Sequence, residues 1–322
     1  MSPQGIPENG TVAEVGEFGL IGRITQGRRH PSSTLLGPGD DAAIVGTPDG
    51  RVVASTDVLV QGVHFRLDWS SPEYVGRKAI AVNLADIAAM GAKPTSVLIG
   101  LACPADTEAS VIAEITNGMW EEAARADVGI VGGDMVRADQ LVISVTALGD
   151  LEGRAPVTRS GARPGDVVAV CGRLGWAAAG LAVLGRGFRS PVGVVNAQRC
   201  PEPPYEAGPA AAVAGATSMI DISDGLLADL GHIASASKVG VDVESERLDI
   251  SARLREVGSA LGSDPLRWVL TGGEDHALVA TFPPFADLPE GWARLGSVTM
   301  PGTGVTVDGK AYEHTAGWEH WR

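Results

Sequence analysis

The sequence predicts a mixed α/β protein with two domains. Its 322 residues exceed the roughly 250–300 residues at which a single hydrophobic core usually stops growing. In both halves, apolar runs typical of strands alternate with segments typical of helices. The segment from Leu151 to Gly165 contains three glycines, two prolines and four residues of Arg or Glu, a composition typical of a domain boundary. We therefore expect an N-terminal domain over 1–150 and a C-terminal domain over 151–322.

The composition indicates an ordinary globular protein and argues against several partners. Hydrophobic residues make up 44% and charged residues 20% of the chain, unlike a disordered sequence. A nucleic acid or an anionic membrane would require a concentrated basic surface, whereas the formal net charge is −14. No stretch approaches the ~18–20 apolar residues that span a bilayer. Residues 1–10 lack a basic start followed by an apolar run, so we expect a short tail there and no secretory signal.

Cysteine usage predicts a reducing, cytoplasmic location. Cys103, Cys171 and Cys200 are odd in number and far apart, with no spacing typical of a disulfide framework or a zinc site. Cys171 lies in an apolar run, where a buried structural thiol is expected in place of a reactive one.

The elements of the first half follow from periodicity and capping. An apolar run over 51–57 predicts a strand that ends in polar groups. A helix from Ser70 to Met90 should follow, because Ser70 and Glu73 have the spacing of a capping box and Gly91 stops the helix. Further on, the pattern predicts a helix over 106–125 and strands over 128–131 and 141–148.

The second half continues the alternation. The pattern predicts strands over 166–171, 217–222, 267–270 and 277–282, and helices over 176–184, 207–214 and 226–237. The segment 185–204, rich in Pro, Gly and Arg, is predicted to be a loop. Each half places a Gly-Gly-acid turn after an apolar strand, at 132–134 and at 272–274.

Acidic residues near glycine at the ends of apolar runs are the most informative feature. They form six groups, at 39–41, 55–57, 86, 133–134, 221–225 and 273–275. A single Asp-Gly or Gly-Asp step is usually only a turn, because Asp tolerates unusual dihedral angles and bonds its own backbone. The repeated placement favours a binding site.

Asp86 is the hardest of these residues to explain as a turn. On a helix, Val75, Ala79, Val82 and Asp86 fall on one continuous face. We therefore expect Asp86 to be buried, and a buried carboxylate is costly unless it is paired or binds a metal. The alternatives are an internal ion pair and a helix that ends before Asp86.

The residue types favour Mg²⁺ over other metals and exclude two classes of kinase. Mg²⁺ prefers oxygen ligands and takes one or two protein carboxylates beside substrate phosphates, so scattered aspartates imply several ions. No cluster of His or Cys favours zinc or a redox metal. With four lysines and neither a P-loop motif nor the protein-kinase motifs, the chain fits neither class.

Taken in order, these groups resemble the motifs of thiamine-monophosphate kinases. The matching strings are 37–43, 55–57 followed by 62–65, 77–79 with 83–92, 132–134, 221–226 and 272–275. They keep the family's order and spacing from about residue 16 to residue 321. The wider superfamily shares an ATP-binding fold with aminoimidazole ribonucleotide synthetase.

The resemblance implies a fold, an assembly and two substrates. It implies two α+β domains of the aminoimidazole ribonucleotide synthetase-like fold, with ATP, Mg²⁺ and dimerisation assigned to the N-terminal domain. It also implies a homodimer in which the N-terminal sheets form a joint barrel. The substrates would be ATP, as phosphoryl donor, and thiamine monophosphate.

The resemblance also implies residue roles at the matching positions. The metal ligands would be Asp41, Ser55, Thr56, Asp57, Asp86, Asp134, Asp221 and Asp224. The ATP contacts would be Gly133, Asp134, Arg159 and Ser223, and the thiamine phosphate contacts His64, Glu274 and Trp318. Asp57, Asp86 and Asp134 would be catalytic, by holding ions that bridge the ATP phosphates. His64 has the alternative of a polar strand-end residue, and Trp318 that of a C-terminal hydrophobic plug.

Three motifs depart from the family's pattern. Ala85 stands where the family usually has Ser, Met135 where it has Thr, and His276-Ala277 where it has Tyr-Glu. The neighbouring carboxylates are retained at all three, so the departures bear on the shape of the pocket more than on metal binding.

The chemistry of a phosphate acceptor fits a site rich in Asp. The second pKa of a phosphate monoester lies near about 6, so its oxygen is largely ionised at pH 7 and needs no general base. The barrier is repulsion between two anions and their alignment, which cations relieve. We therefore expect direct in-line transfer of the γ-phosphoryl group, with Arg159 adding a fixed positive charge.

Two other functions stay open at this point. The first is another ATP-dependent enzyme of the same superfamily that acts on a different small metabolite. The second is a binding protein stabilised by calcium or magnesium, without catalysis. Such a protein would carry its acids in one contiguous loop, whereas here they extend from residue 40 to residue 275.

Overall fold

The computed structural model describes residues 11–15, 22–36, 44–302, 304–312 and 317. By its contacts the chain divides into two compact units. Unit 1 comprises Met1–Asn83 and Pro94–Asp150, and unit 2 comprises Leu84–Lys93 and Leu151–Arg322. The short segment 84–93 is therefore the one part before residue 150 that belongs to unit 2. The tail predicted over 1–10 lies outside the described residues.

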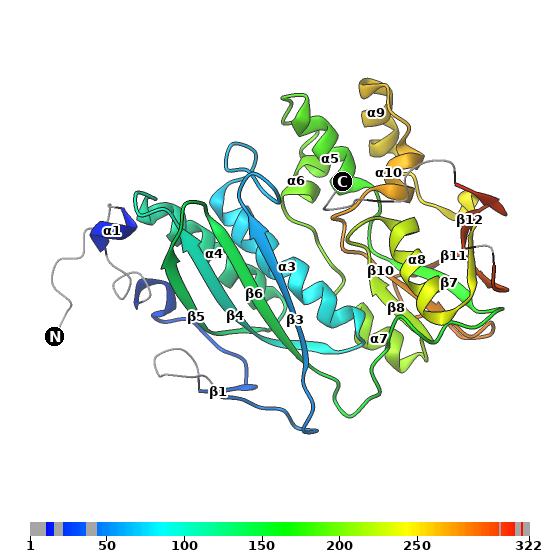
Figure 1. Cartoon of the computed structure of the whole chain (residues 1–322), viewed down its shortest axis with the longest axis horizontal. Helices are drawn as coiled ribbons and strands as arrows, with labels where there is room; N and C mark the ends of the chain where they lie inside the picture. The colour runs from blue at the N-terminus through cyan, green and yellow to red at the C-terminus, as the bar shows by residue number, and fades with distance from the viewer. Residues whose placement is uncertain (1–10, 16–21, 37–43, 303, 313–316, 318–322) are drawn as a thin grey trace. The chain divides into compact units, whose positions relative to one another are not determined.

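Unit 1 is built on a four-stranded sheet with the order β3-β6-β4-β5 (Figure 1). Its strands are β3 (Val53–Val60), β4 (Lys93–Cys103), β5 (Gly129–Arg137) and β6 (Val142–Asp150). Strand β3 pairs antiparallel with β6, and β4 pairs parallel with β5. Every second residue of β6 is buried, as expected of a sheet with one covered face. Helix α1 (Val12–Val15) and the pair β1 (Thr34–Leu36) and β2 (Ile44–Val45) precede this sheet.

Two long helices approach each other closely at glycines in unit 1. They are α3 (Pro72–Ala89), whose first part belongs to this unit, and α4 (Ala109–Arg125). A Cβ on Gly76 would lie 1.8 Å from the carbonyl oxygen of Ile115, and one on Gly118 would lie 1.9 Å from that of Glu73. Only glycine therefore permits this backbone approach.

Unit 2 contains a seven-stranded sheet with the order β13-β12-β9-β11-β7-β10-β8. Its strands are β7 (Val167–Cys171), β8 (Ser218–Asp221), β9 (Gly240–Val243), β10 (Leu278–Phe282), β11 (Trp292–Thr299), β12 (Val305–Val307) and β13 (Lys310–Ala311). All neighbours pair antiparallel except β9 and β12. Mostly antiparallel pairing with separate helices confirms the predicted α/β class and its α+β type.

The helices of unit 2 occupy the connections between these strands. They are α5 (Trp176–Gly185), α6 (Val192–Arg199), α7 (Ala207–Val213), α8 (Leu226–Ser237), α9 (Ala252–Leu261) and α10 (Pro265–Thr271), with the 3-10 helix η1 (Ser245–Arg247). Across the described parts of the chain, no helix combines the length and apolar composition needed to cross a membrane.

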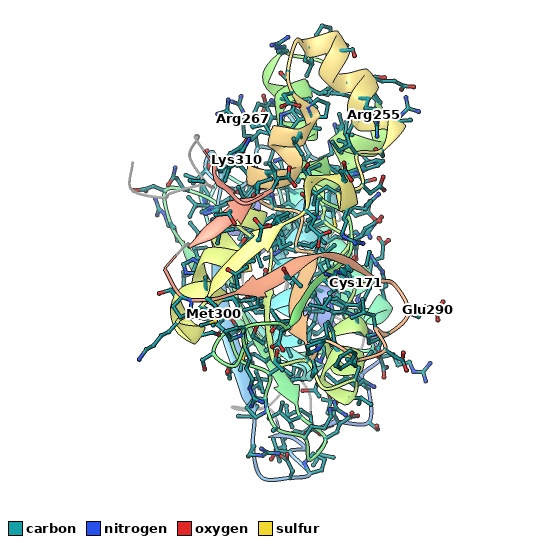
Figure 2. All side chains as sticks on the ribbon, turned by 90° about the vertical axis from the view of Figure 1, so that its right-hand side faces the viewer. Cys171, Arg255, Arg267, Glu290, Met300 and Lys310 are labelled. Carbon is teal, nitrogen blue, oxygen red and sulfur yellow. The ribbon has the colours of Figure 1, made fainter. Side chains whose placement is uncertain are left out.

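The core of unit 2 contains an apolar cluster that includes Cys171. The rings of Phe282 and Trp292 meet edge to face, with centroids 5.4 Å apart. Cys171, labelled in Figure 2, lies on β7 in the same buried cluster. It is 8% exposed, which confirms the predicted buried thiol, and burial raises the pKa of that thiol.

Two predicted elements of the second half are wrong. Residues 267–270 form part of helix α10, because Asp264 accepts the Leu266 N–H at 3.0 Å and Pro265 stands in the first turn. The predicted loop over 185–204 contains helix α6, which packs so closely on α5 that a Cβ on Gly180 would lie 2.1 Å from the carbonyl oxygen of Val194. Both elements depend on neighbours that periodicity does not reveal.

Smaller differences concern the acidic motifs. Gly132, Gly133 and Asp134 lie within β5 at an irregularity of its pairing with β4, so they form no turn. Residues 272–274 follow helix α10, whereas the sequence placed them after a strand. Asp57 lies in the middle of β3 instead of at its end, because the strand runs on to Val60.

Helix α3 confirms the prediction in extent but differs in two details. Its first turn is capped by Ser71, whose Oγ lies 3.4 Å from the Tyr74 amide nitrogen, one residue after the predicted cap. Asp86 is half-buried, not fully buried as predicted. Helix α3 is buried on nearly every side, as the buried Val75, Ala79, Ile80 and Leu84 show. Position on one apolar face therefore does not determine how far Asp86 is buried.

Candidate functional site

Asp221 and His276 form the centre of the acidic group in unit 2. Asp221 is the last residue of β8, and His276 precedes β10, the strand that pairs with β8. The imidazole Nδ1 of His276 lies 3.0 Å from Oδ2 of Asp221, and both side chains are buried. Burial lowers the pKa of His276, but the hydrogen bond to Asp221 and the charge of that carboxylate raise it more. The charges of Glu274 and Asp86 contribute to the same upward shift, so the carboxylates of these two predicted site residues lie near the pair.

The turn that carries Glu274 and His276 is bonded to the segment after β8. The Glu274 N–H donates to the Ser223 carbonyl at 2.7 Å, and the His276 N–H donates to the Ile222 carbonyl at 2.9 Å. Glu274 has φ +67° and His276 has φ +49°, values that non-glycine residues seldom adopt. A Cβ on Gly273 would lie 2.5 Å from the Ser223 carbonyl oxygen, so glycine is needed there. The structure thus brings Asp221, Ser223 and Glu274 together.

Asp224 lies in a second acidic group at the start of α8. Oδ2 of Asp229 accepts the N–H groups of Asp224 at 3.1 Å and Gly225 at 3.0 Å. Ligand atoms of Asp224, Asp229 and His232 all lie within 4.8 Å of one another. Asp229 and His232 are additions to the residues expected from the sequence. Their spacing of three on one helix, directly after the 221–225 motif, is the pattern that could have revealed them.

The electrostatics of unit 2 fit a cation. Burial, together with the negative charges of Asp221 and Asp224, raises the pKa of Asp229 to about 7. Neighbouring carboxylates of this kind share a region of negative potential, which a divalent cation would relieve. Carboxylate oxygens are also the ligands that Mg²⁺ prefers. The donor set of this unit therefore fits Mg²⁺ in chemistry.

Arg159 lies in the segment before β7 and is exposed. Its carbonyl accepts the Ser237 hydroxyl at 3.0 Å, and the neighbouring Thr158 carbonyl accepts the Met219 N–H at 3.2 Å. The backbone of Arg159 is therefore held against the end of α8 and the start of β8. The guanidinium is accessible to a solvent-borne anion.

In unit 1, Asp57 is positioned by an asparagine that the sequence did not single out. Oδ1 of Asn83 accepts the Asp57 N–H at 2.9 Å, and its Nδ2 donates to the Ala79 carbonyl at 2.9 Å. Asn83 is fully buried on α3. The sequence feature that could have pointed to Asn83 is its place at the start of the 83–92 motif. Next to Asp57, the Thr56 hydroxyl donates to the Val145 carbonyl at 2.9 Å. Ser55 is half-buried and lies on the same face of β3 as Asp57, opposite to Thr56.

Gly133 and Asp134 lie on β5, opposite β4. Asp134 pairs in register with Gly100, and its Oδ1 accepts the following Met135 N–H at 2.9 Å. A Cβ on Gly133 would lie 2.2 Å from the Ile99 carbonyl oxygen, so no side chain fits there. Asp134 is exposed.

His64 folds back on its own strand. Its Nδ1 accepts the Val60 N–H at 3.0 Å, which places any proton of a neutral ring on Nε2. Its carbonyl accepts the buried Lys78 ammonium at 3.2 Å. The side chain is half-buried at the end of β3, a position that suits both open interpretations of this residue.

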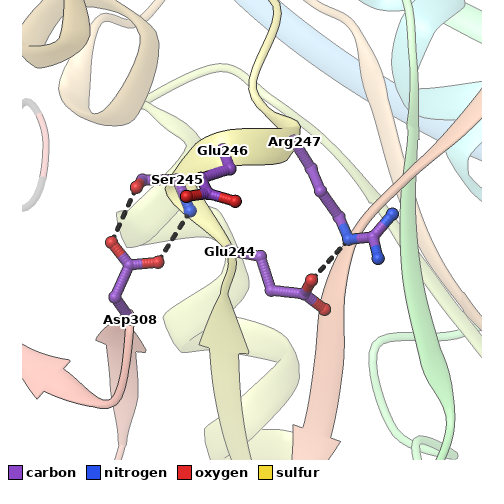
Figure 3. Close-up of a pocket in the computed structure, with 5 residues that line it drawn as sticks. All are labelled: Glu244, Ser245, Glu246, Arg247 and Asp308. Carbon is purple, nitrogen blue, oxygen red and sulfur yellow. Dashed lines mark hydrogen bonds and ion pairs between the residues drawn. The ribbon is translucent and has the colours of Figure 1, made fainter.

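Two predicted site residues lie outside the described residues. They are Asp41 and Trp318. The pocket drawn in Figure 3 is not the predicted site, because none of the residues singled out from the sequence lines it. The residues that line this pocket are bonded to one another. Asp308 accepts the Ser245 N–H at 2.9 Å, and Glu244 forms an ion pair with Arg247.

Matches to known domains define the class of protein. Residues 39–151 match the AIR synthase related protein, N-terminal domain, and residues 163–281 match the AIR synthase related protein, C-terminal domain. With its two α+β units and its groups of carboxylates, the chain is a two-domain protein of the AIR synthase related class.

Relatives narrow this class to one family. The chain is 52% identical over 313 residues to the thiamine-monophosphate kinase of Mycobacterium tuberculosis, and the aligned region covers 97% of this chain and 93% of that one. It therefore belongs to the thiamine-monophosphate kinase family. The structure of thiamine monophosphate kinase from Aquifex aeolicus is similar with a TM-score of 0.78 and 33% identity, over 94% of this chain and 99% of that one. AaThiL complexed with AMPPCP and TMP has a TM-score of 0.78 and 35% identity, over 96% of this chain and 98% of that one. These findings confirm the resemblance, the two-domain fold and the prediction of a kinase.

Proposed function

We propose that this protein transfers the γ-phosphoryl group of ATP to thiamine monophosphate and so makes thiamine diphosphate. The observation that carries the proposal is the similarity, along almost the whole chain, to the structure solved with AMPPCP, an analogue of ATP, and TMP. The acidic groups of both units support it, because two phosphate-bearing substrates need cations to approach each other.

We propose Mg²⁺ as the cation and assign its ligands by residue. In unit 1 these are Ser55, Thr56, Asp57 and Asp134, and in unit 2 they are Asp86, Asp221 and Asp224, with Asp41 as a further ligand. When bound, Mg²⁺ would supply positive charge that neutralises phosphate oxygens. Asp57, Asp86 and Asp134 carry the catalytic role because they fix where that positive charge sits.

The remaining residues bind the two substrates. Arg159 and Ser223 would contact ATP together with the close backbone at Gly133, where no side chain obstructs a phosphate. Glu274 would contact thiamine monophosphate, as would His64 and Trp318, whose indole face suits a cationic thiazolium ring. No protein group needs to remove a proton, since the acceptor phosphate is already ionised at neutral pH. Transfer is therefore direct, with no phosphoenzyme.

The exposed face of the unit 1 sheet supports a homodimer. Val58 pairs with Ser144, and a Cβ on Gly100 would lie 3.6 Å from the Cβ of Ser144, so all three share one face. Leu98, two residues before Gly100, and Val136, two after its partner Asp134, lie on that face as well. Val58, Leu98 and Val136 are 47%, 40% and 53% exposed, which favours a second copy of the sheet as their cover.

Two organisational proposals accompany the activity. We assign ATP, Mg²⁺ and dimerisation to the domain over 1–150, and we expect the enzyme to work in the reducing cytoplasm. The burial of Cys103, Cys171 and Cys200 agrees with structural thiols in such a compartment.

The experiment measures ADP release and product with thiamine monophosphate, with and without Mg²⁺. We expect activity that requires Mg²⁺ and falls about 100-fold or more in Asp57→Asn and in Asp86→Asn, since each removes a charge that holds the cation. Asp68→Asn is the control, because Asp68 is an exposed unit 1 carboxylate outside the predicted site, paired with Arg66 at 2.8 Å. Full activity in both site variants would overturn the assignment.

A second candidate is an ATP-dependent enzyme of the same class with another phosphate-bearing acceptor. The observation that favours it is His276, which departs from the family's usual Tyr and contacts Asp221 directly. Running the assay with a panel of phosphate monoesters distinguishes the two functions. A markedly higher kcat/KM for another acceptor would select the second.

A further inference from the structure

Asp275 is a buried carboxylate in the turn between Glu274 and His276. Its side chain points towards the start of α5, where both of its oxygens accept hydrogen bonds. Oδ2 accepts the Gly175 N–H at 2.5 Å, and Oδ1 accepts the Ala177 N–H at 2.8 Å. Asp275 is 8% exposed, so the two bonds are shielded from water.

These bonds supply the cap that α5 lacks locally. The residue before the helix is Gly175, which has φ +79° and no side chain to accept a helix N–H. A Cβ at this position would lie 2.8 Å from the Val269 amide nitrogen, so a Ser or Asp cap cannot replace the glycine without displacing α10. The carboxylate that does the capping therefore comes from a residue 100 positions after Gly175 in the chain.

The same carboxylate stands between two residues in the left-handed region. Glu274 and His276, with φ +67° and +49°, flank it directly. Non-glycine residues hold such dihedral angles only where surrounding contacts impose them. On one side the turn is bonded to Ile222 and Ser223 through its backbone, and on the other side it is bonded to α5 through Asp275. Removing the second attachment would let the turn relax.

We propose that Asp275 is a positioning residue, which ties the 272–276 turn to the N-terminus of α5 and so aims Glu274 at the phosphate acceptor. This inference rests on the proposed function in one respect, the contact of Glu274 with thiamine monophosphate. The geometric part, a carboxylate that fixes the turn, does not depend on the substrate.

The alternative is that Asp275 only caps a helix. A cap contributes to stability without distinguishing one substrate from the other. A positioning residue, in contrast, should affect the acceptor more than the donor, because Glu274 is assigned to the acceptor alone. The ratio of the two KM values therefore separates the interpretations.

The test compares Asp275→Asn with Asp242→Asn. The asparagine at 275 is close in shape but presents an NH₂ group to one of the two amide donors, so one bond is lost. Asp242 is a matched control, because its Oδ1 also accepts a backbone amide, from Gly309 at 2.8 Å, together with the Thr306 hydroxyl. It lies on β9, separated from β10 in the sheet by β11 and β7.

We expect Asp275→Asn to raise KM for thiamine monophosphate by about 10–100-fold, with KM for ATP changed less than about twofold. Amide hydrogen exchange of 272–277 and of Gly175 and Ala177 should become faster in this variant and not in Asp242→Asn. Equal changes in both KM values, or an unchanged acceptor KM, would overturn the positioning role. If the wild-type chain does not phosphorylate thiamine monophosphate, the proposed function fails, and the exchange measurement alone decides whether Asp275 holds the turn.

Discussion

His276 and Asp221 are joined by a hydrogen bond of 3.0 Å between Nδ1 and Oδ2, and both side chains are buried. The bond connects the end of β8 to the turn before β10. It therefore links a residue assigned to the metal with one of the residues at which this chain departs from its family.

This pair predicts a pH-dependent contribution to stability. The pKa of His276 is raised above its ordinary value, because the bond and charge of Asp221 outweigh the effect of burial. The native state thus binds the proton more tightly than the unfolded state, where the pKa is about 6.5. The contribution is fully present below that pH and is lost as pH rises through the native pKa.

We expect wild type to exceed His276→Gln in free energy of unfolding most at about pH 5.5, with a smaller difference at about pH 8.5. Urea unfolding in the presence of EDTA at several pH values measures this difference. His232→Gln, at an exposed position on α8, is the control. A difference that does not vary with pH would contradict the prediction.

Asn83 predicts a loss of both stability and metal affinity in unit 1. In Asn83→Ala the part-buried Asp57 N–H loses its acceptor, which should cost about 1–3 kcal/mol. Because the same bond fixes the backbone of Asp57, the Mg²⁺ concentration for half-maximal activity should rise. Thermal unfolding and a Mg²⁺ titration of the kinase reaction check the two effects.

The control for this variant is Thr116→Ala. Thr116 is a buried helix residue of unit 1 whose hydroxyl bonds only its own helix, at the Ile112 and Ala113 carbonyls. It should lower stability without changing the Mg²⁺ requirement. An unchanged Mg²⁺ requirement in Asn83→Ala would show that Asp57 is positioned by other contacts.

The space around two helical glycines, Gly118 in unit 1 and Gly231 in unit 2, predicts opposite effects on stability when each is replaced by alanine. In Gly118→Ala the new methyl would meet the Glu73 carbonyl oxygen at 1.9 Å, so α3 and α4 must separate, at a cost of about 1–3 kcal/mol or more. In Gly231→Ala on α8 the new methyl meets no described atom within 4 Å beyond its chain neighbours and the backbone of its own helix. That variant should gain up to about 1 kcal/mol from helix propensity. Chemical denaturation of both variants tests the pair, and equal destabilisation would contradict it.

The exposed sheet face predicts an oligomer that charge can disrupt. Introducing Val58→Glu and Leu98→Glu together would place two carboxylates on that face and should convert a dimer into a monomer of 33.1 kDa. Leu181→Glu is the control, because Leu181 is similarly exposed, at 44%, on α5 of unit 2. Sedimentation analysis gives the masses. A wild-type chain that is already monomeric would remove the basis of this prediction.

Local pattern was sufficient for the elements whose stability is local. Helix α8 has the predicted bounds, and α3, β7 and β10 agree within a few residues, because apolar periodicity and stop residues specify them. The ordered acidic motifs were also sufficient to indicate the family. In contrast, a short apolar run at 267–270 fits a strand or a helix equally well, and only the cap at Asp264 and the packing of α10 decide between them.

What the sequence by itself determined is which chemical groups the chain carries and in which order: carboxylates near glycines, spaced as in the thiamine-monophosphate kinase family. The tertiary structure alone decided how those groups are held. Asn83 bonds Asp57 across 26 positions, His276 bonds Asp221 across 55, and Asp275 bonds Gly175 across 100. The physical reason is that a hydrogen bond depends on distances in space, and distances between remote residues are set by the packing of whole sheets and helices, which local sequence patterns do not encode.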